Sequence, residues 1–226
     1  RTLHGRIRPA AAKNSVLPLL AATLLCRTPS RLRAVPPLAD VATSLALLQS
    51  VGAKAERQGS DLFVAPGQDL QGEIPDYLAG AMRSSVFYLA PLLCRVGEVR
   101  LPLPGGCKLG PRPVDIHLAG LAAMGAQVEL EGIAVTLRRR GPLHGVDFAL
   151  RLPSVGATMT LMMAATQAGG TTILRGAACE PEICDLANFL RACGAHITGA
   201  GTPVVVSRAT IRSFILTFDS ADGTCY

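Results

Sequence analysis

Residues 114–137, VDIHLAGLAAMGAQVELEGIAVTL, predict a helix followed by a β-hairpin. Apolar residues recur at helical spacing as far as Met124, and the pair Gly125-Ala126 then ends the helix. The two short apolar runs after this pair predict strands at 127–130 and 133–137. The same order of helix, Gly-Ala pair and two strands occurs three times, with the glycines at positions 52, 125 and 194.

These copies predict three βαβαββ repeats of about 70 residues each. The predicted helices are 13–25, 41–51, 83–94, 114–124, 157–167 and 183–193, and the predicted strands are 32–35, 54–57, 62–65, 98–103, 127–130, 133–137, 171–174, 196–198 and 204–206. The repeats span about 12–67, 70–141 and 142–207, between an N-terminal strand segment, 1–11, and an atypical C-terminal tail, 208–226, in which 214–218 is strand-like.

The first helix of each repeat is apolar on nearly every side, which is typical of a helix in a protein interior. The strands alternate apolar and charged residues, as in Val135-Thr136-Leu137-Arg138, and this pattern suits sheets with one face in water. The predicted fold class is therefore α/β (α+β), an inverse α/β barrel-like domain with helices inside, sheets outside and pseudo-threefold symmetry.

Composition excludes several classes of protein. Hydrophobic residues make up 49% of the 226 residues, yet no apolar run reaches the roughly 18 residues of a membrane span, so we expect a cytoplasmic protein with no membrane partner. The net charge of +6 suits an anionic substrate, whereas 4% aromatic residues and no Trp argue against nucleic acid. Seven scattered cysteines without a CxxC pair argue against a disulfide framework and a zinc site, and we expect no metal and no cofactor. Cys26, Cys94 and Cys193 are expected to be small buried hydrophobes.

A glycine- and proline-rich loop, 101–117, presents Cys107 beside Lys108 and Arg112. The helix that starts after this loop offers backbone N–H groups for an anion. Symmetry brings the starts of equivalent helices, at Lys13-Asn14, Arg83-Ser84 and Ser154-Val155-Gly156, towards a common region. Two such helix starts with cations nearby predict a diphosphate site.

Five stretches together resemble the enolpyruvyl transferases, and within them the branch that uses UDP-N-acetylglucosamine (UDP-GlcNAc). They are Ala12-Lys13-Asn14, Met82-Arg83-Ser84-Ser85, the run from Leu103 through Cys107 to Arg112-Pro113-Val114-Asp115-Ile116-His117, Ser154-Val155-Gly156-Ala157-Thr158 and Glu180-Pro181-Glu182-Ile183. The resemblance extends from Leu3 to about Thr202.

The resemblance implies transfer of an enolpyruvyl group from phosphoenolpyruvate to the 3-hydroxyl of UDP-GlcNAc, with release of phosphate, in the first committed step of peptidoglycan synthesis. It implies that Cys107 protonates the methylene carbon of phosphoenolpyruvate and is the thiol that fosfomycin alkylates. Lys13 and Arg112 would hold phosphoenolpyruvate, and Asn14 would contact the sugar hydroxyl. The implied UDP-sugar contacts are Arg83, Phe87, Pro113, Val114, Asp115, Ile116, His117, Ser154, Val155 and Gly156.

Departures from the family pattern leave alternatives open. The family has two domains of three repeats, so a chain with one such domain is expected to be truncated or frame-shifted and to lack the aspartate base of the second domain. Leu152 stands where a lysine is usual, and Arg151 is a candidate replacement. The alternatives are a non-catalytic domain with a partial UDP-sugar site, and a 5-enolpyruvylshikimate-3-phosphate synthase-like transferase, a branch that lacks the Pro-Gly-Gly-Cys loop. An inert loop thiol and simple helix-start roles for Lys13, Asn14, Asp115 and His117 are the structural alternatives.

Overall fold

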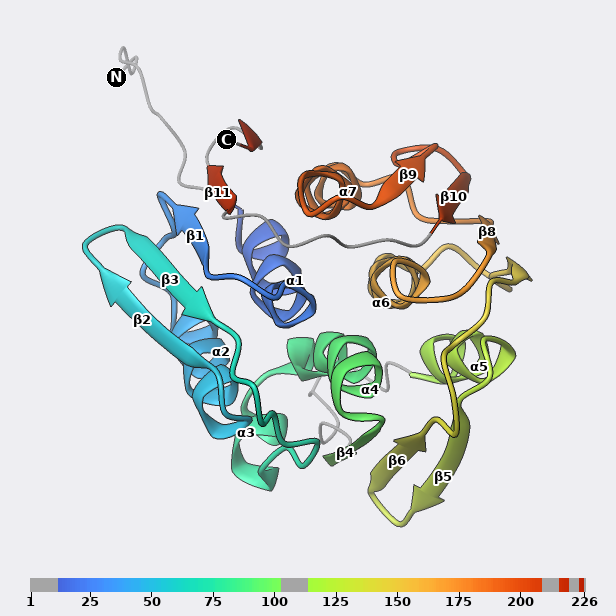
Figure 1. The fold of residues 1–226 in the computed structure, drawn as a ribbon, viewed down its shortest axis with the longest axis horizontal. Helices are drawn as coiled ribbons and strands as arrows, with labels where there is room; N and C mark the ends of the chain where they lie inside the picture. Colours follow the sequence, from blue (N-terminus) through green and yellow to red (C-terminus); the bar gives the residue numbers. More distant parts are fainter. Residues whose placement is uncertain (1–11, 103–113, 209–215, 220–223, 226) are drawn as a thin grey trace, which may run out of the picture.

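The computed structural model describes residues 12–102, 114–208, 216–219 and 224–225. Figure 1 shows three sheets at the periphery and helices between them, with α1, α4 and α6 nearest the centre. The predicted arrangement of helices inside and sheets outside is therefore confirmed.

The first repeat follows the predicted order closely. Its elements are α1 (Lys13–Ala22), η1 (Thr23–Leu25), β1 (Ser30–Arg33), α2 (Ala39–Ser50), β2 (Lys54–Gln58) and β3 (Asp61–Ala65). β1 begins and ends two residues before the predicted strand, because Ala34 takes a left-handed backbone conformation with φ of 55°. The Asp61 carboxylate accepts a hydrogen bond from the Ala34 amide at 3.2 Å, which stabilises this turn.

The second repeat contains one helix that the sequence analysis did not predict. Its elements are α3 (Asp76–Ala81), η2 (Arg83–Tyr88), α4 (Leu89–Val96), β4 (Glu98–Pro102), α5 (Asp115–Ala123), β5 (Gln127–Glu131) and β6 (Ala134–Arg138). The predicted helix 83–94 divides into a 3₁₀ segment and an α-helix. Pro91 lies in the first turn of α4, where its missing N–H costs no intrahelical hydrogen bond, so the α-helix begins at Leu89.

The third repeat adds a short strand before its first helix. Its elements are β7 (Asp147–Ala149), α6 (Val155–Ala165), β8 (Thr171–Arg175), α7 (Pro181–Ala192), β9 (His196–Thr198) and β10 (Val204–Arg208). The sheet order is β7-β8-β10-β9, and β7 pairs in parallel with β8. This strand is the first β of the βαβαββ repeat.

The same sheet position is filled differently in the other two repeats. In the second repeat the sheet order is β4-β6-β5, and a parallel bridge joins Glu73 to Arg100 of β4. In the first repeat, β11 (Leu216–Asp219) from the C-terminal tail pairs in parallel with β1, and β12 (Thr224–Cys225) pairs with β11. The tail thus supplies the first-strand position of the first repeat's sheet, from a stretch that the sequence analysis expected to be strand-like.

The three Gly-Ala pairs end helices as predicted. Gly52, Gly125 and Gly194 have φ values of 94°, 101° and 97°, a region that residues with a Cβ rarely adopt. The alanine after each glycine is buried and directly precedes a strand. Equivalent turns therefore define the threefold relation of the repeats.

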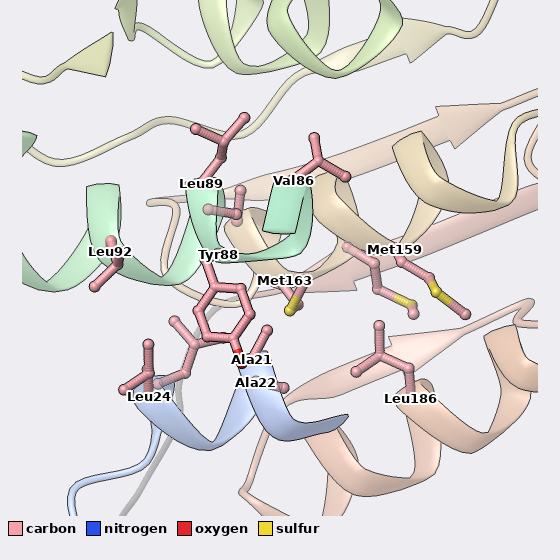
Figure 2. Close-up of a cluster of buried hydrophobic side chains, with 14 of the residues drawn as sticks. Ala21, Ala22, Leu24, Val86, Tyr88, Leu89, Leu92, Met159, Met163 and Leu186 are labelled. Atoms are coloured by element: carbon pink, nitrogen blue, oxygen red, sulfur yellow. The ribbon is translucent and has the colours of Figure 1, made fainter. Parts of the chain in front are cut away.

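The core lies between the inner helices. Residues 15–22 of α1 and 157–165 of α6 are all buried, which explains why these helices lack a polar face. Figure 2 shows Tyr88, at the end of η2, reaching toward Ala21 and Ala22 of α1. Its hydroxyl is paired with the Ser44 hydroxyl at 2.5 Å, which satisfies a polar group in this apolar cluster. In the described part of the chain, no helix has the length and apolar character needed to cross a membrane.

Candidate functional site

The start of α1 is tied to the starts of two outer helices. The Lys13 ammonium lies 2.8 Å from the Asp40 carboxylate in the first turn of α2. Asn14 donates a long hydrogen bond of 3.4 Å to Glu182 in the first turn of α7. Ser15, one residue on, donates to Asp185 at 2.5 Å. The predicted residues Lys13 and Asn14 are exposed, and carboxylates of α2 and α7 lie next to them.

A second set of contacts joins the starts of α5 and α6. The Arg151 guanidinium, four residues before α6, donates to the Asp115 carboxylate of α5 at 2.6 Å. The His117 ring nitrogen Nδ1 and the Thr160 hydroxyl are 3.0 Å apart. These two contacts hold the predicted residues of the second and third repeats against each other.

Gly156 permits the close approach of α6 to His117. A Cβ at this position would lie 3.0 Å from Cε1 and 3.1 Å from Nε2 of His117, and 4.0 Å from Cε1 of Phe87. Phe87 belongs to η2, which packs against both α1 and α6. The structure therefore brings Phe87, His117 and Gly156 together from three segments, and η2 also packs against α1.

The start of α6 is suited to an anion. Ser154 caps the helix, its hydroxyl accepting a hydrogen bond from the Ala157 amide at 3.3 Å, and the first turn contains no carboxylate. Unpaired N–H groups in such a first turn carry a partial positive charge. Arg151, four residues before this helix, is a cation whose charge is paired with the Asp115 carboxylate. Leu152 is apolar and contributes no charge.

His117 is held in its neutral form. Burial lowers the pKa of the imidazole to about 4, although the nearby Asp115 carboxylate acts in the opposite direction. At neutral pH this ring is therefore uncharged, and it contributes a hydrogen bond with Thr160 rather than a positive charge.

The remaining predicted residues occupy supporting positions. Arg83 opens η2 and is half-buried. Ile116 is buried, and Val114 and Val155 pack their side chains against the core, which leaves main-chain atoms for a ligand. Cys107, Arg112 and Pro113 lie outside the described residues.

Sequence reasoning did not find Asp40, Glu182 or Thr160 as neighbours of these groups. They come from helices distant in sequence, and the available signal was the acidic first turn of α2 and α7. No cluster of metal-ligating side chains occurs among residues 12–102 and 114–208.

Two polar cavities of about 330 and 370 Å³ lie elsewhere, where Gln68 and Arg95 line both. None of the predicted site residues lines either cavity. Both cavities are therefore distinct from the candidate site at the helix starts.

Comparison with known proteins places the chain in a family. The sequence model of the EPSP synthase (3-phosphoshikimate 1-carboxyvinyltransferase) family matches residues 1–210. The chain belongs to the EPSP synthase family. Among curated members, the UDP-N-acetylglucosamine 1-carboxyvinyltransferases of Cellvibrio japonicus and Oleidesulfovibrio alaskensis are 47% and 48% identical over 201 and 210 residues. These alignments cover 88% and 93% of this chain, and 48% and 50% of the relatives.

Solved structures of the EPSP synthase family share the fold. The enolpyruvyl transferase NikO from Streptomyces tendae superimposes with a TM-score of 0.82 at 22% identity, over 96% of this chain and 51% of that one. EPSP synthase from Acinetobacter baumannii gives a TM-score of 0.75 at 16% identity, over 95% of this chain and 50% of that one. The chain spans about half the length of the curated relatives it matches.

Proposed function

We propose that the protein transfers the enolpyruvyl group of phosphoenolpyruvate to the 3-hydroxyl of UDP-GlcNAc and releases phosphate, a cytoplasmic step that begins peptidoglycan synthesis. The observation that carries the proposal is the 47–48% identity, over nine-tenths of the chain, to relatives named for this activity. EPSP synthase itself is the second candidate of the family, but its solved structures are only 15–16% identical to this chain.

In the proposed complex, the starts of α5 and α6 hold the UDP group. The diphosphate sits at the first turn of α6, with Ser154, Val155 and Gly156 around it. Arg151 supplies the cation at this corner, since its guanidinium is already fixed by Asp115 at 2.6 Å. Uracil lies against the main chain from Pro113 to Ile116.

The sugar and phosphoenolpyruvate lie toward the start of α1. Lys13 and Arg112 hold the phosphate and carboxylate of phosphoenolpyruvate, while Asn14, Arg83 and Phe87 contact the UDP-sugar. The pair of Lys13 with Asp40 does not prevent this role, because side chains exposed to 50% and 34% form an ion pair worth about 1 kcal/mol or less. A substrate phosphate competes with that carboxylate easily.

Cys107 performs the proton transfer in this proposal. Its thiol gives a proton to the methylene carbon of phosphoenolpyruvate, and the sugar oxygen bonds to the adjacent carbon. Loss of phosphate, and of one proton from the methyl group formed in the first step, then gives the enolpyruvyl ether. The base that accepts the proton of the sugar hydroxyl is not assigned to this chain.

Steady-state phosphate release tests the proposal. Release from phosphoenolpyruvate is expected to require UDP-GlcNAc and to disappear in Cys107→Ala, whereas the matched variant Cys179→Ala, at an exposed cysteine outside the site, keeps its rate. Release that requires shikimate 3-phosphate instead of UDP-GlcNAc would contradict the proposal.

The alternative is a non-catalytic domain with a partial UDP-sugar site. Calorimetric titration of UDP-GlcNAc separates it from the first proposal. Saturable binding without phosphate release supports the alternative, and release that depends on Cys107 excludes it.

A further inference from the structure

Two cysteines from different repeats meet in the interior, away from the proposed substrate site. Cys26 directly follows η1 in the first repeat, and Cys193 directly follows α7 in the third. Their sulfur atoms are 3.4 Å apart, and the residues are only 2% and 1% exposed. The sequence prediction that both are buried is confirmed. Their sulfur–sulfur contact also makes a reaction between the two thiols possible, which burial alone does not.

The surroundings of Cys26 favour its thiolate. The Arg95 guanidinium donates to the carbonyl of Leu24 at 2.5 Å and to that of Cys26 at 3.0 Å, so a fixed positive charge lies beside this turn. The Cys193 thiol, as the main cause, and the Arg95 charge lower the pKa of the Cys26 thiol, although burial opposes them. A thiolate stabilised in this way is the nucleophile that oxidation requires.

Cys94 shows that a position near an arginine is not sufficient to lower the pKa of a thiol. It adjoins Arg95 in sequence, and burial raises the pKa of its thiol to about 12 although the Arg139 charge opposes this. Cys94 is only partly buried, not fully buried as the sequence analysis predicted, and it is a comparison thiol without the features of the Cys26–Cys193 pair.

Solvent reaches the edge of this region. The cavity of about 370 Å³ is lined by Arg95 and by Arg27, the residue after Cys26. A small neutral oxidant in this cavity would contact Arg27, the residue that follows Cys26 in the chain.

We propose that Cys26 and Cys193 form a site of oxidative modification, at which a small peroxide such as hydrogen peroxide converts the two thiols into a disulfide joining the first and third repeats. The Cys26 thiolate attacks one peroxide oxygen and breaks the O–O bond, which gives a sulfenic acid and, after protonation, water. The Cys193 sulfur then attacks the Cys26 sulfur and displaces a second water. Two thiols and one peroxide thus give one disulfide and two waters.

The geometry requires little movement for this bond. A disulfide has a sulfur–sulfur distance of about 2 Å, so the present separation of 3.4 Å must shorten by roughly 1.4 Å. Both residues are helix caps, where a change of side-chain rotamer does not break an interior turn of helix. The residues are 167 positions apart, so the link would restrict the unfolded chain strongly.

Peptide mapping of the native protein after hydrogen peroxide treatment tests the proposal. Remaining thiols are alkylated under denaturing conditions, and the protein is digested without reductant. We expect a cross-linked pair of peptides containing Cys26 and Cys193, two hydrogens lighter than their sum, which dithiothreitol separates. The melting temperature of the oxidised protein is expected to rise by about 5 °C or more and to return after reduction.

Variants distinguish this disulfide from general oxidation. Cys193→Ser and Cys193→Ala, each checked for folding by circular dichroism, are expected to lose the link, and Cys94→Ala keeps it. The proposal is overturned if exposed Cys179 is oxidised while Cys26 and Cys193 are both recovered as alkylated thiols. It is equally overturned if Cys26 is found linked to a cysteine other than Cys193.

Discussion

Replacing Gly120 with alanine is expected to destabilise the protein where α5 packs against α6. A Cβ at this position would lie 2.4 Å from both Cδ atoms of Leu161 and 2.9 Å from its Cγ. Leu161 has no exposed surface, so its side chain has no free space to enter. Overpacking a core costs about 1–3 kcal/mol, and three contacts below 3 Å place this site near the upper end.

Helix propensity acts in the opposite direction but is smaller. Alanine is favoured over glycine within a helix by about 1 kcal/mol, so the net loss in the free energy of unfolding is about 2 kcal/mol. For a chain of this size, the melting temperature falls by about 4–8 °C. Urea unfolding followed by circular dichroism measures the free energy of unfolding, and thermal unfolding followed in the same way measures the melting temperature.

Gly80→Ala is the matched control. Gly80 is also helical, in α3, but a Cβ there meets nothing within 4 Å, so we expect stabilisation of up to about 1 kcal/mol. The double variant Gly120→Ala/Leu161→Ala should lose less than the sum of its two single variants. If Gly120→Ala is as stable as Gly80→Ala, the inference that α5 packs too closely on α6 to admit a Cβ at position 120 is wrong.

Two further predictions concern buried polar groups. His117 has a native pKa of about 4 against an ordinary value of 6.5, so the unfolded chain binds this proton first and stability falls as the pH drops. Between pH 7 and 5 the loss is about 2 kcal/mol, and an equal loss in His117→Asn would contradict this origin. Tyr88→Phe removes a hydroxyl that pairs with Ser44 at 2.5 Å, and we expect a loss of about 1–2 kcal/mol in urea unfolding. Unchanged stability would show that Ser44 finds another partner.

Repetition made most of the fold predictable. The Gly-Ala pairs fix where a helix ends and a hairpin begins, and in the structure all three glycines adopt the left-handed conformation that this role requires. The apolar first helices likewise predicted which elements are interior, since residues 15–22 and 157–165 are buried throughout.

Short and non-local elements escaped prediction for physical reasons. α3 has six residues and β7 has three, which is too few for a helical or alternating pattern to stand out. The pairing of β11 with β1 joins positions far apart in the chain, so no local pattern specifies it. The predicted helix 83–94 divides at Leu89 because Pro91 fits the first turn of an α-helix but not its interior.

The site residues stay a prediction, and their partners in the fold were not predictable from the sequence. The resemblance located Lys13, Asp115 and Gly156, and the structure places all three at helix starts. The pair of Lys13 with Asp40 depends on how α1 packs on α2 within the first repeat. The contact of Asp115 with Arg151 and the close approach of Gly156 to His117 depend on how the second and third repeats pack, and residue spacing along the chain encodes neither arrangement.

A crystal structure with bound UDP-GlcNAc tests the central claim most directly, namely that helix starts of the second and third repeats form one UDP-sugar site. We expect the diphosphate at the first turn of α6, within hydrogen-bond distance of the backbone of Val155 and Gly156, with Arg151 beside it and uracil near Asp115. A nucleotide bound in the cavities around Arg95, with the α6 start unoccupied, would contradict the account.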